Sequence, residues 1–359
     1  MTTVFLDTNI FMNEKFLKSA NAQAFLKACK LLNINVAIPE LVIDEVKGNF
    51  PKALGERLAS HKKTYKELAK IIDIEEPSIS VEEESERYQE WLKEFIEEDG
   101  IGVIPYPNVT PKDLVLKSYE GAKPFKGTGE GYKDFMIWGS IAGHIKDNMT
   151  AGPYYFLVNN PADFCAEKSD KEWTLHPELK SQFENEAEIP DVFVTIGKFF
   201  DAIIKPKLEG ITIDQVPPLT IDEIDDMTTK ILEKEISGYS AFGFEGVPFS
   251  NEVYASVAGD TTVEDRELKK IDDEIVIVVT GTVLIEVDGY MDKHEFYSED
   301  FEDSGICVID GDHNDHVMAV SKTVDTSFEL KLFYSPETKE VTGHSLELPG
   351  EIQDDYPYK

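Results

Sequence analysis

Hydrophobic positions in the first 205 residues alternate between two spacings. Short apolar runs at residues 3–6, 35–38 and 154–158 are bounded by polar or turn residues and predict buried strands, with weaker candidates at 102–105 and 192–196. Apolar residues three and four positions apart predict helices at about 15–33, from Ser80 to Ile96 and at 134–146. Strands that alternate with helices favour a parallel sheet with helices on both faces.

Capping residues and prolines set the expected helix boundaries. Ser80 followed by Glu83 has the spacing of a capping box, which predicts a helix start. Pro39 is predicted to open a helix, and Pro51 is predicted to interrupt or end it, because proline lacks the N–H that a helix interior uses. Residues 123–131 are rich in glycine and are predicted to be a flexible loop.

The periodicity changes to two after Tyr239. Residues 274–287, 316–324, 327–334 and 341–348 are predicted to be strands, which indicates a small, mostly antiparallel β domain. Residues 206–220 are dense in proline and lack periodicity, as is typical of a linker. The expected fold is therefore an α/β domain at 1–205, a linker at 206–220, and an acidic, β-rich (α+β) domain of unknown role at 221–359.

Four acidic residues occupy positions that suit a metal site. Asp7 and Asp163 follow apolar runs predicted to be strands, and Glu45 and Asp134 lie in stretches with helical spacing. Carboxylates at strand ends and helix starts converge at the carboxyl edge of a parallel sheet. Oxygen ligands of this kind bind Mg²⁺ or Mn²⁺, which can activate water and neutralise a phosphodiester. The alternative interpretation is structural: Asp7 and Asp163 as helix caps, and the other two on solvated helix faces.

The four acids and the segments around them resemble the PIN-domain ribonucleases over about residues 3–205. The resemblance is closest to a subgroup with a Gly-x-Lys-Asp-x-x-Ile-Trp segment, here 131–138, followed by an Asn-x-x-Asp-Phe segment, here 160–164. It implies a PIN-like parallel sheet flanked by helices. It also implies a divalent-metal-dependent endonuclease acting on single-stranded RNA, with Asp7, Glu45, Asp134 and Asp163 as catalytic metal ligands.

One position departs from the family pattern. Many PIN domains carry Thr-x-Asp after the fourth strand, where this chain has Val158, Asn159 and Asn160. Asp163, three residues later, is then expected to be the fourth acid. Asn160 is expected to contribute a neutral oxygen beside the ligands, and Asn9 to orient Asp7 by hydrogen bonding.

Four lysines are candidate contacts for a nucleic acid. Lys133 adjoins Asp134 and is positioned to meet a scissile phosphate, with an ordinary surface lysine as the alternative. The other three, Lys62, Lys63 and Lys66, belong to a predicted helix in which basic residues outnumber acidic ones. Such a helix can guide a phosphate backbone, and the alternative is that it only presents a solvated face.

Net charge complicates the assignment to nucleic acid. The chain carries −35 overall, and residues 206–359, with 36 acidic and 11 basic side chains, account for −25 of it. Nucleic-acid-binding domains are usually basic, so this charge counts against tight, non-specific binding to long nucleic acids without excluding a local basic groove.

Composition also bounds location and partners. The chain has no apolar run long enough to span a membrane and begins without a signal peptide, and its three cysteines are widely spaced, so a cytoplasmic protein is expected. Two alternatives stay open beside an endoribonuclease: a non-catalytic PIN-like module that engages a protein partner, and a nuclease acting on DNA. A protein partner or a second copy of the chain is expected to bind through the C-terminal domain.

Overall fold

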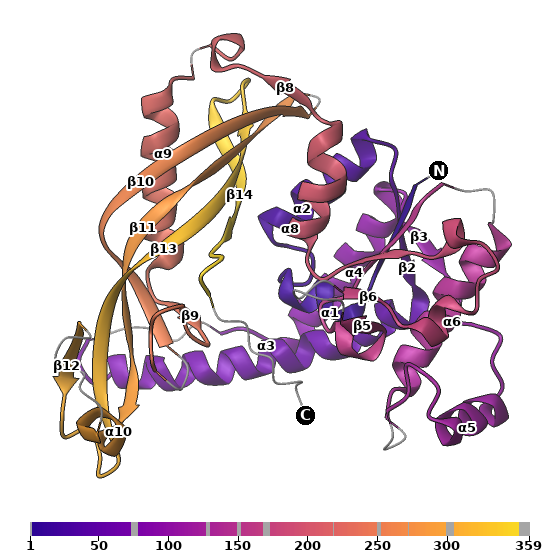
Figure 1. Ribbon diagram of the computed structural model, residues 1–359, viewed down its shortest axis with the longest axis horizontal. Coiled ribbons are helices and arrows are strands. Elements are labelled where there is room, and N and C mark those ends of the chain that lie inside the picture. Colours follow the sequence, from indigo (N-terminus) through magenta and orange to yellow (C-terminus); the bar gives the residue numbers. More distant parts are fainter. Residues whose placement is uncertain are drawn as a thin grey trace. The chain divides into compact units, whose positions relative to one another are not determined.

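The computed structural model describes residues 2–72, 78–126, 130–148, 152–167, 173–217, 219–249, 253–271, 273–298 and 305–351. Contacts along the chain divide it into two compact units, Met1–Lys207 and Leu208–Lys359. Each unit is drawn in Figure 1. Among the described residues, no helix is long and apolar enough to cross a membrane.

The described part of the first unit is built on a five-stranded parallel sheet (Figure 1). Its strands, in spatial order, are β3 (Gly102–Ile104), β2 (Asn35–Pro39), β1 (Thr3–Leu6), β4 (Tyr154–Leu157) and β7 (Asp191–Phe193). Every residue of the two central strands, β1 and β4, is buried, so both faces of the sheet are covered. The parallel sheet predicted from the apolar runs is thus confirmed.

Helices follow most of these strands. The longer ones are α2 (Ala20–Leu31), α3 (Glu40–Leu68), α4 (Val81–Glu98), α5 (Pro111–Glu120) and α6 (Tyr132–Asp147), and the shorter ones are α1 (Thr8–Asn13), α7 (Pro177–Lys180) and α8 (Ile196–Phe199). The short strands β5 (Cys165–Glu167) and β6 (Trp173–Leu175) pair with each other. Ser80 caps α4 by accepting from the backbone N–H of Glu83, as its spacing predicts.

Two expected helix boundaries are wrong. Pro51 lies inside α3, which continues for 29 residues without a break. The proline removes one hydrogen bond, but packing of α3 against α1, α4, α6 and β2 offsets that loss. The helix expected from residue 15 begins at Ala20 instead, because Lys15, Phe16 and Leu17 have positive φ angles of 50–61°, which a right-handed helix does not contain.

The second unit is a mostly antiparallel sheet, which confirms the expected class. Three strands of 19 residues each dominate it: β10 (Val253–Ile271), β11 (Glu274–Asp292) and β13 (Val317–Ser335). Shorter strands join them: β8 (Glu209–Ile211), β9 (Tyr239–Ala241), β12 (Ile306–Asp310) and β14 (Glu340–Glu347). The separate strands expected at 316–324 and 327–334 are one continuous strand, β13, paired with β11 along its whole length.

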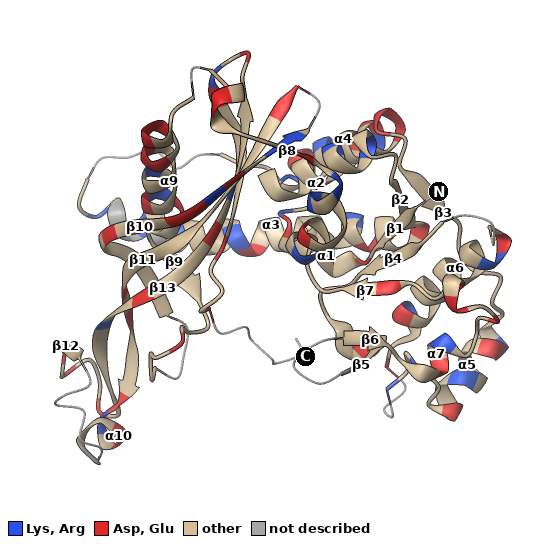
Figure 2. Ribbon diagram, turned by 45° about the horizontal axis from the view of Figure 1, so that its top comes forward, with Lys and Arg blue, Asp and Glu red and all other residues tan. Residues whose placement is uncertain are grey.

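Helix α9 (Ile221–Ile236) packs on the sheet of the second unit through residues spaced at helical intervals, Ile224, Thr228, Leu232 and Ile236. Arg266 of β10 fixes it further, with two hydrogen bonds of 2.7 and 2.6 Å to Asp225. A second helix, α10 (Lys293–Ser298), follows β11. Acidic positions line α9 and the long strands (Figure 2).

The segment predicted to be a linker, 206–220, is not free of structure. Its strand β8 pairs with β10 through Glu209, Gly210 and Ile211, and so belongs to the sheet of the second unit. This segment has too few apolar residues to predict a strand from the sequence, and its backbone pairing with β10 is what makes it one. Independent folding of the two units stays a prediction.

Candidate active site

Asp7 stands between the central strand and the first helix. It directly follows β1 and is the N-cap of α1, accepting from the backbone N–H of Asn9 at 3.5 Å. Its side chain is buried, with 3% of the residue exposed. Burial, followed by the negative charge of Asp134 and more weakly that of Glu45, raises the pKa of Asp7 to about 7. The residue is therefore both a helix cap and a destabilised carboxylate.

Glu45 lies early in α3, the helix that follows β2, and two donors bind its carboxylate. The hydroxyl of Thr8 donates to Oε2 at 2.7 Å, and the Lys133 ammonium lies 2.7 Å from Oε1. The Glu45 side chain is only 12% exposed, whereas that of Lys133 is half exposed. The glutamate thus joins the first helix, α3 and the start of α6 at one point.

Asp134 lies in the first turn of α6. The preceding Gly131 caps this helix with a φ of 103°, and a Cβ there would lie 2.7 Å from the carbonyl oxygen of Pro124, so the approach of the loop requires glycine. The buried side chains of Ile137 and Trp138, one turn later, hold the helix in place. Burial and then the charges of Asp163 and Glu45 raise the pKa of Asp134 to about 6.

Asp163 ends a single turn of 3-10 helix, Pro161–Asp163, that follows β4. The next residue, Phe164, is buried and packs edge-on against Phe156 of β4, with ring centroids 5.1 Å apart. The Asp163 carboxylate accepts from the Asn160 amide at 3.0 Å and lies 2.8 Å from the Lys126 ammonium. Asp163 is buried, and one of its oxygens accepts a hydrogen bond while the other forms an ion pair.

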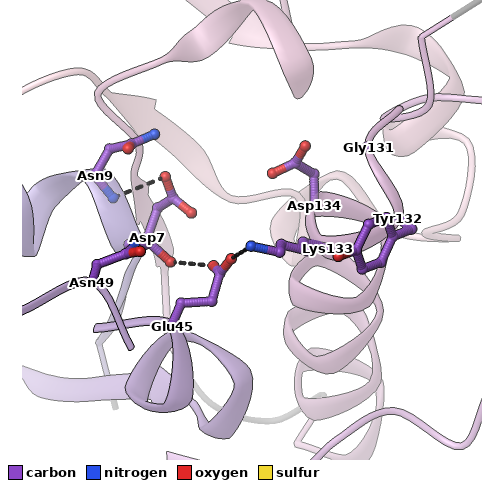
Figure 3. A pocket seen from close by; sticks show the side chains of 9 residues that line it. Asp7, Asn9, Glu45, Asn49, Gly131, Tyr132, Lys133 and Asp134 are labelled. Carbon is purple, nitrogen blue, oxygen red and sulfur yellow. Dashed lines mark hydrogen bonds and ion pairs between the residues drawn. The ribbon is translucent and has the colours of Figure 1, made fainter. Parts of the chain in front are cut away.

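These side chains converge at the carboxyl ends of the parallel strands. A pocket of about 240 Å³ is lined by Asp7, Thr8, Asn9, Glu45, Asn49, Gly131, Tyr132, Lys133 and Asp134. Figure 3 shows Asp7 and Asp134 on opposite sides of this pocket, with Glu45 and Lys133 joined between them. Asp163 is not among the lining residues, but its charge is the strongest acidic influence on Asp134.

All four acids lie in a part of the chain that matches a known protein family. Residues 4–164, which include all four acids, match the sequence model of a family described as the PIN domain. Residues 4–164 of the N-terminal unit form a PIN domain. PIN domains are typically metal-dependent nucleases. The C-terminal region is not assigned to a family, and no curated protein and no solved structure matches the chain.

Each of the three residues predicted to lie beside the acids contacts one of them. Asn9 lines the pocket and contacts Asp7 through its backbone N–H. Asn160 donates its amide N–H to Asp163 at 3.0 Å. Lys133 lies at the pocket, in an ion pair with Glu45. The roles of these residues in binding or catalysis stay predictions.

The predicted basic stretch of α3 lies away from the pocket. Lys62 is 17 residues beyond Glu45 on the same helix, which is about 25 Å at 1.5 Å per residue. Lys62 and Lys66 are exposed, and the side chain of Lys63 lies outside the described residues. A role for these lysines in binding the PIN domain's substrate stays a prediction, and it requires a substrate that extends well beyond the pocket.

Three residues near the acids escaped the sequence analysis. Thr8 and Asn49 line the pocket, and Lys126 pairs with Asp163. Asn49 is one helical turn beyond Glu45, so its spacing was an available signal. Lys126 belongs to the glycine-rich segment, and nothing in the sequence connects it to an acid 37 positions later. Only the fold brings these two residues together.

Proposed function

We propose that the PIN domain is a divalent-metal-dependent endonuclease that hydrolyses phosphodiester bonds of single-stranded RNA. The observation that carries the proposal is a pair of acids, the buried Asp7 and the partly buried Asp134, which face one pocket at the carboxyl edge of the sheet. Their pKa values are raised by burial and by neighbouring negative charge. A cation between them would compensate this charge.

The residues present fit Mg²⁺ or Mn²⁺. In the described part of the chain, no three His, Cys, Asp or Glu side chains are close enough to hold an ion as they stand. Mg²⁺ does not need such a cage, since it keeps several waters and is often bound by one or two carboxylates together with substrate phosphate. Asp7 and Asp134 supply hard oxygen ligands of this type, and the bound ion would activate water and neutralise the scissile phosphate.

Two side chains at the pocket favour a nucleic-acid strand as substrate. The Lys133 ammonium offers a positive charge beside the acids for a phosphate. Tyr132, the first residue of α6, also lines the pocket and is 57% exposed, which makes its ring accessible to an unpaired base. Stacking on an aromatic ring requires an unstacked base, so these residues support a single strand over a duplex.

Two observations favour a second candidate, a non-catalytic module that binds a protein partner. Asn159 and Asn160 stand where many PIN domains have an acid, and lysines already pair with Glu45 and Asp163. In that case the fold would be kept without a working metal site. Binding of a protein partner or a second copy through residues 221–359, and a cytoplasmic location, stay predictions.

A cleavage assay with purified full-length protein separates these functions. Fluorescent RNA and DNA oligomers of one sequence, single-stranded and duplex, are incubated with Mn²⁺, with Mg²⁺ or with EDTA. We expect metal-dependent cleavage of single-stranded RNA that Asp134→Asn abolishes and Asp147→Asn, at the exposed end of the same helix, does not. Cleavage of DNA alone would change the substrate class, and no cleavage with either metal would favour the binding module.

A further inference from the structure

The four acids of the PIN site fall into two pairs with different surroundings. Glu45 and Asp163 each have both oxygens in contact with protein donors: Thr8 and Lys133 for Glu45, Asn160 and Lys126 for Asp163. These four contacts measure 2.7, 2.7, 3.0 and 2.8 Å. Both carboxylates are nearly buried, at 12% and 9% side-chain exposure. Their positions are therefore fixed, and their charges are already compensated.

Asp7 and Asp134 lack such partners. Within the residues that the structure describes, neither forms an ion pair at the distances of the Glu45 and Asp163 pairs, and the donors at Asp7 are backbone N–H groups of Thr8 and Asn9, the latter at 3.5 Å. Both side chains line the pocket, on opposite sides of it (Figure 3). The oxygens available to a new ligand thus belong to Asp7 and Asp134. Burial is the main cause of their raised pKa values, and the charges of Lys126 and Lys133 offset the rise at Asp134 only in part.

The charge balance of the site then limits how many metal ions it can hold. Four ionised carboxylates and the two ammonium groups of Lys126 and Lys133 leave a net charge of −2. One divalent cation neutralises that charge. Two such ions, which stand about 3.5–4 Å apart in two-metal nucleases, would leave an excess of +2 and bring a dication next to an ammonium group. The short lysine contacts place positive charge where a second ion would need ligands.

We infer that Lys126 and Lys133 take the place of a second metal ion, so that the site binds a single divalent cation through Asp7 and Asp134. Glu45 and Asp163 then position the two lysines and do not act as primary metal ligands. The inference rests on the proposed function, because it concerns the metal and the charges of that same site. It assigns Lys126, a residue without a role so far, to the active site.

Counting bound Mn²⁺ tests the inference without any cleavage. Free Mn²⁺ is measured by electron paramagnetic resonance while the ion is titrated into full-length protein at pH 8 and moderate salt. We expect one ion per chain in the wild type. Asp7→Asn and Asp134→Asn should each lower the affinity by at least tenfold, whereas Glu45→Gln and Asp163→Asn should still bind one ion, with a smaller loss.

The lysine variants give the sharper readout. Replacing both lysines, as Lys126→Gln with Lys133→Gln, restores the charge for a second ion, and we expect the count to rise from one to two per chain. Lys112→Gln, an exposed lysine on α5, is the matched control and should leave the count at one. Circular dichroism verifies that each variant is folded, and the single lysine variants substitute if the double variant is not.

The outcomes for the inference and for the nuclease proposal are distinct. Two ions of similar affinity in the wild type would overturn the inference and leave a metal-dependent nuclease intact. An unchanged count in folded lysine variants would also overturn it. One ion without cleavage of any oligomer would support the inference and reject the nuclease. Absence of Mn²⁺ binding at millimolar concentration would reject both.

Discussion

The Lys133 ammonium lies 2.7 Å from Oε1 of Glu45, and this ion pair ties the first turn of α6 to the N-terminal part of α3. The two residues come from segments almost ninety positions apart, and each is adjacent to a group that faces the pocket. Lys133 precedes Asp134 in the chain, and Glu45 accepts from Thr8, the neighbour of Asp7. A substitution of either residue in this ion pair should therefore alter the surroundings of both Asp7 and Asp134.

Replacement of Asp134 should separate catalysis from folding. Asp134→Asn keeps the shape of the side chain but removes a partly buried negative charge that neighbouring acids destabilise. We expect cleavage to fall by about 100-fold or more, because even a change in the surroundings of a metal costs up to about 100-fold. In the absence of metal, its melting temperature at pH 8 should be equal to or above that of the wild type. Full activity in this variant would rule out the site assignment.

Acidity should stabilise the metal-free protein. Asp7 and Asp134 ionise near pH 4 when unfolded but at about 7 and about 6 when folded. Between pH 4 and these folded-state pKa values, the folded state binds more protons than the unfolded state. The contribution of the two groups to stability is therefore fully present below about pH 4 and is lost as the pH rises through 6 and 7. Melting temperatures measured with EDTA should fall from pH 5 to pH 8, and less steeply in Asp7→Asn. Mg²⁺ should recover part of the loss at pH 8.

Two glycines, one before α6 and one within it, should respond oppositely to alanine. Gly131 has a φ of 103° and no room for a Cβ, so Gly131→Ala should destabilise the PIN domain by about 1–3 kcal/mol and displace Asp134. Gly143 lies inside the helix, and a Cβ added there would have no neighbouring atom within 4 Å, so Gly143→Ala should be neutral or stabilising by about 0.5–1 kcal/mol. Chemical denaturation of both variants checks the contrast, and equal effects would contradict it.

Removal of the acidic unit should raise the activity of the PIN domain at low salt. Residues 206–359 carry a net charge of −25, which repels a polyanion over distances that salt shortens. Initial rates of the full chain and of residues 1–205 are compared on one generic RNA oligomer across a salt series, after circular dichroism has shown that the fragment folds. We expect the fragment to be faster at low salt, with the gain shrinking as salt increases. A folded fragment that is no faster at any salt would point instead to a targeting role for the second unit.

The sequence predicted those parts of the fold that depend on local chemistry. Buried strands such as β1 and β4 follow short apolar runs, and Ser80 marks a helix start by its own hydrogen bond. Strand β10 was missed because it is mostly polar, with bulges near Thr261 and Asp265, and its pairing with β11 and not its own pattern makes it a strand. The helix through Pro51 was missed for the same reason, since tertiary packing overrides a local preference.

The sequence singled out the four acids of the candidate site and two of their neighbours, Asn9 and Lys133. Asp7, Glu45, Asp134 and Asp163 follow strands or begin helices, so their convergence follows from parallel topology. Their partners do not follow from it. Lys126 pairs with Asp163, 37 positions later, and Thr8 donates to Glu45, also 37 positions later. The spacing of hydrophobic residues predicts neither contact.

Ion pairs at Glu45 and Asp163 also bear on how the protein is made. Some small metal-dependent domains stay unfolded until their ion arrives, because the free energy of metal binding supplies their free energy of folding. Here two of the four acids carry a counter-charge supplied by the chain itself. We therefore expect the domain to fold before any ion is taken up, so that Mg²⁺ or Mn²⁺ would enter a finished scaffold.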